Sequence, residues 1–328
     1  VESIQKGLRT SLRPVALTLA AVFAIPVGLA TIPADTTGTL RIVGIQGNAN
    51  AGLFAHEAPG TIRDNHLDAT RSFLKTGEKF DLVVWPENAS DKNPDDDLET
   101  KQILTDLVNN SLGKPLIFGT ITTNGDRMHN SSKLWLPNRG EVDQYDKKRP
   151  VPFGEYVPDR DFFYQLSPDL VGMITRGYDF GTRDGIFDVS GEKLGILICF
   201  EEAIDELPRD LVSQGASLII AQTNNADFGY SDESVQQLAI ARLRAIETGR
   251  AIVNISTVGP SAIIDSHGNF LDSSPAYKAD YVIADVPKSS AMTLAMLGGW
   301  MFDPAMAVLA GMLMVWLLVD NRRKTTRL

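Results

Sequence analysis

LGILICFEE, residues 194–202, is an apolar run that ends at the only cysteine of the chain and continues into two glutamates. A short apolar run of this kind favours a β-strand. The pattern recurs in DLVVW at residues 81–85, PLIFGTI at 115–121, SLIIAQ at 217–222 and AIVNIST at 251–257. Longer amphipathic stretches separate these runs, so the sequence predicts an α/β domain.

Further elements follow from the same patterns. Strands are also predicted at residues 40–46, 133–136, 261–265 and 281–285, and helices at 61–76, 98–110, 204–213 and 232–248. The last helix opens with acidic residues, and its spacing predicts a buried side formed by Leu238, Ala241, Leu243 and Ala245. The run DKNPDDD at residues 91–97 is interpreted as a solvated loop, because it lacks the Gly and Glu of a calcium loop.

Composition excludes several classes of partner. The 328 residues are 43% hydrophobic and carry a net charge of -10, which argues against binding of nucleic acid. The single cysteine, Cys199, excludes an intramolecular disulfide framework. No metal site and no cofactor are predicted, and the oligomeric state stays open.

Two apolar segments enclose the mixed middle of the chain. Residues 14–32 contain no charge, and residues 292–319 are interrupted only by Asp303-Pro304, so each is long enough to span a bilayer. Basic residues flank both outer ends, namely Lys6, Arg9, Arg13, Arg322, Arg323, Lys324 and Arg327. Since such residues favour the cytoplasmic side, we expect a multi-pass protein of the cell membrane with its middle on the extracytoplasmic face. Alternatively, the first segment is a signal peptide.

These segments define three parts of the chain. Residues 1–36 are predicted to hold a cytoplasmic stub and a transmembrane helix, and residues 37–290 the catalytic domain. Residues 291–328 are predicted to hold a second transmembrane helix and a basic tail.

Reactive side chains follow hydrophobic runs at three places. Glu87 comes after a strand that ends at Pro86, Lys147 lies in a basic turn, and Cys199 ends the run quoted above. Taken singly, each of these residues is also explained without a catalytic role, as an exposed glutamate, a solvated lysine and a small buried thiol. Together, a thiol, a carboxylate and an ammonium group suffice for covalent acyl transfer without histidine. A Cys-His pair is the weaker hypothesis, because none of the four histidines has an obvious partner.

Several motifs occur together in one order. They are GIQGN at residues 44–48, WPEN at 85–88, YDKKRPVPFGEYVP at 145–158, ICFEE at 198–202, TNNADFG at 223–229 and QQLAIARLRAIETGRA at 236–251. In this order they resemble the nitrilase (carbon-nitrogen hydrolase) superfamily and, within it, the apolipoprotein N-acyltransferase family. The resemblance covers about residues 41–285 and continues into the second apolar segment.

The resemblance implies a fold and a set of site residues. The expected fold is a four-layer α-β-β-α sandwich, here flanked by transmembrane helices. The general base falls on Glu87, the lysine on Lys147 and the nucleophile on Cys199. Glu155 is expected to orient the lysine or the thiol, and Glu201 to support the loop. Where the family often has Tyr after its cysteine, this chain has Phe200.

The resemblance also implies an activity. Cys199 would take an acyl chain from a membrane phospholipid as a thioester and pass it to the N-terminal amine of a diacylglyceryl apolipoprotein. Family members usually carry several membrane helices before the catalytic domain, whereas one is expected here, so the chain is either a fragment or a reduced branch. Two alternatives stay open: a nitrilase-type amidase for small carbon-nitrogen substrates, and a catalytically idle membrane scaffold.

Overall fold

The computed structural model describes residues 36–52, 55, 57–174 and 177–325. The first predicted span, residues 14–32, lies outside these residues. Contacts group Thr36–Met296 into one compact unit, and the residues from Leu297 onward belong to another.

Two six-stranded sheets form the centre of the domain. In the first sheet the spatial order is β12 (Asp280–Ser289), β1 (Thr36–Gln46), β2 (Leu82–Val84), β3 (Leu116–Asn124), β4 (Arg127–Leu136) and β5 (Gly140–Asp146). In the second it is β11 (Phe270–Ser274), β10 (Ser261–Ile264), β9 (Ile252–Ser256), β8 (Leu218–Thr223), β7 (Glu192–Ile198) and β6 (Ile186–Val189). The central trios β1-β2-β3 and β7-β8-β9 are parallel, so their carboxyl ends lie at one edge of each sheet.

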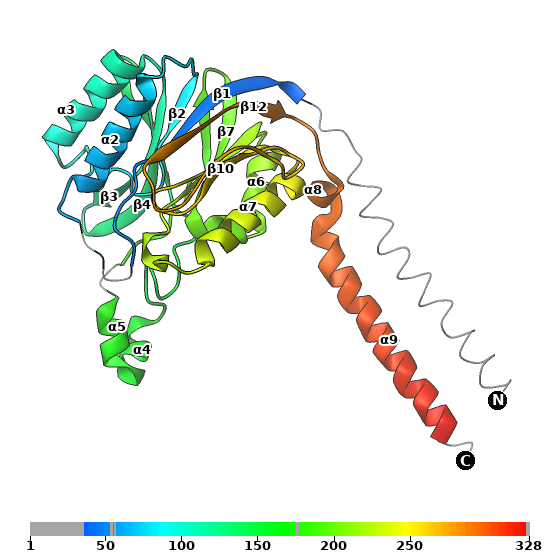
Figure 1. The fold of residues 1–328 in the computed structure, drawn as a ribbon. Coiled ribbons are helices and arrows are strands. Elements are labelled where there is room, and N and C mark those ends of the chain that lie inside the picture. The colour runs from blue at the N-terminus through cyan, green and yellow to red at the C-terminus, as the bar shows by residue number, and fades with distance from the viewer. Residues whose placement is uncertain (1–35, 53–54, 56, 175–176, 326–328) are drawn as a thin grey trace. The chain divides into compact units, whose positions relative to one another are not determined.

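Helices cover the outer face of each sheet (Figure 1). On the first sheet lie α2 (Thr61–Leu74) and α3 (Leu98–Asp106), the latter continued by the π-helical turn Leu107–Leu112. On the second lie α6 (Glu206–Ser213) and α7 (Glu233–Thr248). The layers therefore run α-β-β-α, and the predicted four-layer sandwich is confirmed.

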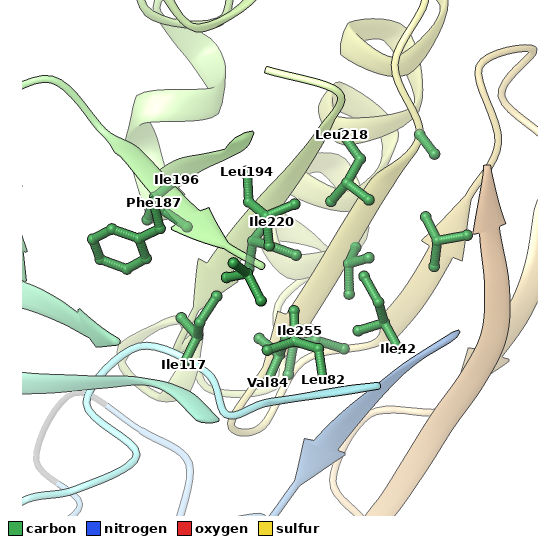
Figure 2. Close-up of a cluster of buried hydrophobic side chains, with 14 of the residues drawn as sticks. Ile42, Leu82, Val84, Ile117, Phe187, Leu194, Ile196, Leu218, Ile220 and Ile255 are labelled. Atoms are coloured by element: carbon green, nitrogen blue, oxygen red, sulfur yellow. The ribbon is translucent and has the colours of Figure 1, made fainter. Parts of the chain in front are cut away.

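The core between the sheets follows from the period of two along each strand. Leu82 and Val84 point to the inner face and pack with Ile196 and Ile220 of the second sheet (Figure 2). Val83, between them, points outward to α2 and α3. Because both faces are covered, the strands need hydrophobic residues at every position, which is the pattern seen in the sequence.

All of the strands and helices predicted within residues 40–285 are present, and further elements in this range were not predicted. The strands β5, β6 and β11 were not predicted. Each lies at a sheet edge and has at most two buried residues, so none forms a long unbroken apolar run. The prediction for Leu243 was wrong, since its side chain is 66% exposed. The buried stripe of α7 runs through Leu238, Ala241 and Ala245, and Leu243 falls off this spacing.

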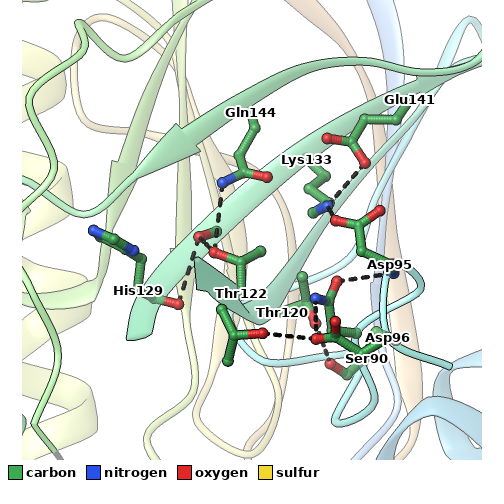
Figure 3. Close-up of polar contacts among 12 residues, drawn as sticks. Ser90, Asp95, Asp96, Thr120, Thr122, His129, Lys133, Glu141 and Gln144 are labelled. Atoms are coloured by element: carbon green, nitrogen blue, oxygen red, sulfur yellow. Dashed lines mark hydrogen bonds and ion pairs between the residues drawn. The ribbon is translucent and has the colours of Figure 1, made fainter. Parts of the chain in front are cut away.

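The acidic run at residues 91–97 is a loop, but its carboxylates are not simply solvated. Asp91 accepts hydrogen bonds from the backbone N–H groups of Gly60 (2.6 Å) and Arg63 (3.1 Å). Asp97 caps α3 by accepting from the N–H of Glu99. Asp95 pairs with the fully buried Lys133, which also bonds Glu141 at 2.8 Å (Figure 3). The acidic residues therefore fasten the loop to α2, α3 and β4.

Two short helices, α4 (Arg160–Leu166) and α5 (Pro168–Met173), form an arm that projects from the domain (Figure 1). Exposed apolar side chains exclude core packing for most of it: Phe162, Leu166, Leu170 and Met173 are 53–66% exposed. The arm thus presents an apolar surface to its surroundings.

The second predicted span forms α8 (Leu294–Gly298), the 3-10 turn Gly299–Met301 and α9 (Phe302–Thr325). Pro304 lies in the first turn of α9, where a missing N–H is tolerated. All side chains of residues 304–317 are exposed, and none of them is charged. Among the described residues, no helix meets the length and hydropathy required to cross a membrane.

Candidate active site

Glu87 lies in a tight loop at the carboxyl end of β2. The strand ends at Val84, and the ladder cannot continue through Pro86, which has no N–H. The loop then folds onto β3, where the N–H of Gly119 donates to the Pro86 carbonyl (3.0 Å) and the Gly119 carbonyl accepts from the N–H of Ser90 (3.0 Å). A Cβ at Gly119 would lie 2.6 Å from the Asn88 nitrogen, so this close approach requires glycine.

The loop is fastened on both sides. Within the first sheet, the Thr120 hydroxyl donates to the Ser90 carbonyl at 2.8 Å (Figure 3). From the second sheet, the Gln222 amide donates to the Trp85 carbonyl (2.6 Å) and the Thr257 hydroxyl to the Glu87 carbonyl (3.2 Å). The backbone of Glu87 is therefore held by the carboxyl ends of strands in both sheets.

Lys147 follows β5 and is almost completely buried. Its backbone N–H donates to the Asn130 carbonyl and its own carbonyl accepts from the N–H of Gly181, both at 2.8 Å. The ammonium nitrogen lies 2.9 Å from Glu155 Oε2 and 3.5 Å from Glu87 Oε1. Burial lowers the pKa of Lys147, but the charges of Glu87, Cys199 and Glu155 outweigh it, so the pKa is raised and the ammonium stays charged.

Asn130, on β4, joins the two carboxylates and was not predicted. Its Nδ2 donates to Glu87 Oε1 at 2.6 Å and to Glu155 Oε1 at 2.8 Å. The amide orientation is thereby fixed, because its oxygen would repel both carboxylates. No hydrophobic pattern marks this polar strand interior, and only the pairing of β4 with β3 and β5 brings Asn130 to the site.

Glu87 has the electrostatic properties of a proton acceptor. Burial raises its pKa, Lys147 lowers it, Glu155 raises it and the Asn130 hydrogen bond lowers it, with a net upward shift. A carboxyl group whose pKa is raised toward neutrality exchanges protons more effectively at physiological pH.

Cys199 lies at the carboxyl end of β7, in a left-handed backbone conformation with φ of 54°. Non-glycine residues adopt this conformation at a cost, and it is concentrated at functional sites. The side chain is half-buried. Burial raises the pKa of the thiol, the charge of Glu87 raises it further, and Lys147 lowers it. The net shift is upward, so the resting thiol is protonated and needs a base.

Glu201 ties the cysteine turn to the lysine loop. Its Oε1 accepts from the Tyr145 hydroxyl (2.9 Å) and from the N–H groups of Lys148 (2.7 Å) and Arg149 (3.2 Å). Its Oε2 accepts from the N–H of Ile198 at 2.9 Å. One buried carboxylate therefore sets the end of β5 against the end of β7. Phe200, which lies between Cys199 and Glu201 in the sequence, is 42% exposed.

The residues singled out by sequence come from distant segments that the fold brings together. Glu87, Lys147 and Glu155 form one buried ionic cluster, and the charges of all three act on the Cys199 thiol. Glu201 supports the loop rather than this cluster. The arrangement offers a thiol, a base and a fixed cation, which are the groups needed to form and resolve a thioester.

Comparisons with known proteins agree with this architecture. An amidase of the nitrilase superfamily from Nesterenkonia AN1 has a similar fold, with a TM-score of 0.58 and 16% identity over 77% of this chain and 93% of that one. The apolipoprotein N-acyltransferase of Mycolicibacterium smegmatis is 28% identical over 310 residues, which is 90% of this chain and 50% of the relative. That of Geobacter metallireducens is 31% identical over 204 residues, or 60% of this chain and 38% of the relative.

The chain thus spans about half of the length of the curated relatives that it matches. The carbon-nitrogen hydrolase family model matches residues 57–295, a range that contains Glu87, Lys147 and Cys199. The chain therefore belongs to the carbon-nitrogen hydrolase family.

Proposed function

We propose that the protein is a membrane-bound N-acyltransferase, which moves an acyl chain from a phospholipid through a Cys199 thioester to the N-terminal amine of a diacylglyceryl apolipoprotein. The observation that carries this proposal is the buried cluster of Glu87, Lys147 and Glu155, whose charges act on the only thiol. Several curated relatives named apolipoprotein N-acyltransferase support the choice of acceptor.

In the first step the Cys199 sulfur attacks the ester carbonyl of the phospholipid. Glu87 takes the thiol proton, and Lys147 stabilises the oxyanion of the tetrahedral intermediate. The intermediate collapses when the ester oxygen leaves with the proton from Glu87, which releases lysophospholipid and leaves the acyl group on sulfur.

In the second step the free amine of the acceptor attacks the thioester carbonyl. Glu87 removes a proton from the attacking amine and returns it to the departing sulfur, which restores the thiol. The products are an amide and the resting enzyme. Glu155 and Asn130 keep Glu87 and Lys147 in place through both steps.

Apolar surfaces support a membrane location. The exposed side chains of the α4–α5 arm and of residues 304–317 would be stabilised in a lipid environment. We place the domain on the extracytoplasmic face, with residues 14–32 and 292–319 as membrane segments, because basic residues flank their outer ends.

Labelled phospholipid tests the proposal. The full chain in lipid vesicles should acquire label that hydroxylamine removes, and a diacylglyceryl peptide should then take the label. Cys199→Ala should acquire none, whereas Glu87→Gln should fold normally and label at least about 100-fold more slowly. Label that persists in Cys199→Ala would refute the nucleophile. An unlabelled wild type that hydrolyses small amides would identify an amidase, and a folded wild type with neither activity a scaffold.

A further inference from the structure

A row of hydrogen-bonded side chains, formed by Ser256, Asn225 and Gln237, ends at the sulfur of Cys199. Gln237, on α7, lies with its Nε2 3.5 Å from Cys199 Sγ, and its Oε1 accepts from Asn225 Nδ2 at 2.8 Å. Asn225 Oδ1 accepts from the Ser256 hydroxyl at 2.8 Å. The other acceptor within reach of that hydroxyl, the Asn224 carbonyl, is slightly farther away at 3.0 Å. Ser256 Oγ in turn accepts from the N–H of Gly259 at 2.8 Å. Every donor in this row points toward the sulfur.

The row is built into the ends of two parallel strands. Asn225 follows β8 and Ser256 closes β9, so both lie at the edge of the sheet where β7 delivers the cysteine. Asn225 is buried and has a φ of 65°, which aims its side chain from a strained turn. A Cβ at Gly259 would lie 3.0 Å from the Asn225 Cγ, so the loop packs closely around the amide. These contacts fix the direction in which Gln237 points.

We propose that Gln237, oriented by Asn225 and Ser256, donates a hydrogen bond to the sulfur of Cys199 and stabilises the thiolate that forms and departs during acyl transfer. The role rests on the proposed function, in which Cys199 is the nucleophile. Gln237 contacts the reacting atom, and Asn225 and Ser256 are positioning residues. A hydrogen bond to an anion is stronger than one to a neutral group, so the contact favours the thiolate over the thiol.

The charges around the sulfur explain why a neutral donor is useful. Glu87 and Glu155 oppose the thiolate, and Lys147 favours it. The ammonium of Lys147 is already shared between those two carboxylates. Glu201 and Glu202 lie on the same turn as the cysteine, and both are buried. Gln237 therefore adds stabilisation without adding a charge that would pair with the carboxylates.

Alkylation of the thiol measures this effect without reference to acyl transfer. Because Cys199 is the only cysteine, the rate of reaction with iodoacetamide reports on this sulfur alone. The rate is measured against pH for the full chain in lipid vesicles, for wild type, Gln237→Leu, Gln237→Glu and Asn225→Asp. Gln236→Leu is the matched control, since Gln236 neighbours Gln237 on α7 and is exposed.

We expect Gln237→Leu to shift the alkylation profile upward by about one pH unit and to slow the reaction about tenfold at neutral pH. Gln237→Glu should shift it further upward, because a carboxylate replaces the donor. Asn225→Asp should also shift the alkylation profile upward. Both carboxylate oxygens of the new side chain accept hydrogen bonds, so they draw the NH2 group of Gln237 away from the sulfur and leave the Gln237 oxygen facing it. Gln236→Leu should match wild type.

The proposal would be overturned if folded Gln237→Leu had the wild-type alkylation profile. A downward shift of the profile would also overturn it, because that shift would mean that the Gln237 oxygen faces the sulfur. If Gln237→Leu fails to fold, the similarly shaped Gln237→Glu decides by the same criterion. This test is separate from that of the acyltransferase proposal, which is judged by label transfer. If label transfer is lost but the alkylation profile is shifted in the variants, the Gln237 contact still stands. If label transfer is normal and the alkylation profile is unshifted, the Gln237 contact is refuted.

Discussion

At the scale of single residues, Glu202 is the least expected group in the site region. It follows Glu201 on the cysteine turn, is buried, and neither of its carboxylate oxygens has a hydrogen-bond partner among the described residues. Burial raises the pKa of Glu202 from 4.5 to about 8, although Arg244 opposes the shift. At neutral pH the side chain is therefore largely protonated, and its protonation favours the folded state.

The sign of the pH dependence follows. Because the folded pKa is raised, the contribution of Glu202 to stability is complete below about pH 4.5 and is lost as the pH rises toward 8. Glu202→Gln is neutral at every pH, so its advantage over wild type should grow across this window by up to about 1.4 kcal/mol per pH unit. Denaturant unfolding at several pH values measures it. Glu206→Gln, at a 74% exposed side chain, is the control. A pH-independent difference for Glu202→Gln would contradict the prediction.

Asn130 gives a second prediction at this scale. Asn130→Asp replaces the donor between Glu87 and Glu155 by a third carboxylate, which should raise the pKa of Glu87 further and displace Lys147 from its partners. We expect transfer of label from phospholipid to fall about 100-fold. Asn124→Asp, on an exposed position of the adjacent strand β3, should transfer at the wild-type rate. Equal rates in both variants would show that the bridge is dispensable.

At the scale of elements, the Glu87 loop depends on the absence of a side chain on β3. Gly119→Ala places a Cβ 2.6 Å from the Asn88 nitrogen and the Pro86 oxygen, both backbone atoms that cannot turn aside. The loop must move, so we expect a loss of about 1–3 kcal/mol in the free energy of unfolding and slower thioester formation.

Gly172→Ala is the matched control, because a Cβ at Gly172 on α5 meets no atom within 4 Å. Its unfolding free energy should stay close to wild type, and thioester formation should be unchanged. Activity retained in Gly119→Ala would mean that the loop adapts without displacing Glu87.

Elements also show what could be predicted from the sequence. The central strands were predictable because burial on both faces leaves unbroken apolar runs, such as that of β7. The edge strand β5 was not, since polar residues such as Asp143 and Gln144 dominate it. Glu87, Lys147 and Cys199 could be named from strand ends and motif order. Asn130 and Gln237 could not, because their roles arise from pairing and packing between distant segments.

At the scale of the whole molecule, the apolar surfaces predict a lipid environment. In a Cys199→Ala background, Leu313→Cys on α9 should resist a membrane-impermeant maleimide when the chain is in lipid vesicles, because the proposed bilayer excludes the reagent. Asp126→Cys, at an exposed position between β3 and β4, should react fully. Equal labelling of the two positions in intact vesicles would contradict the membrane assignment of residues 292–319.

The Glu201 carboxylate has a mechanical consequence for the whole domain. By accepting from Ile198 at the end of β7 and from Lys148 and Arg149 in the loop after β5, it couples the two halves of the sandwich, so neither can slide without breaking a buried hydrogen bond. Hydrogen exchange at these three amides should be among the slowest in the domain and should accelerate together in Glu201→Gln.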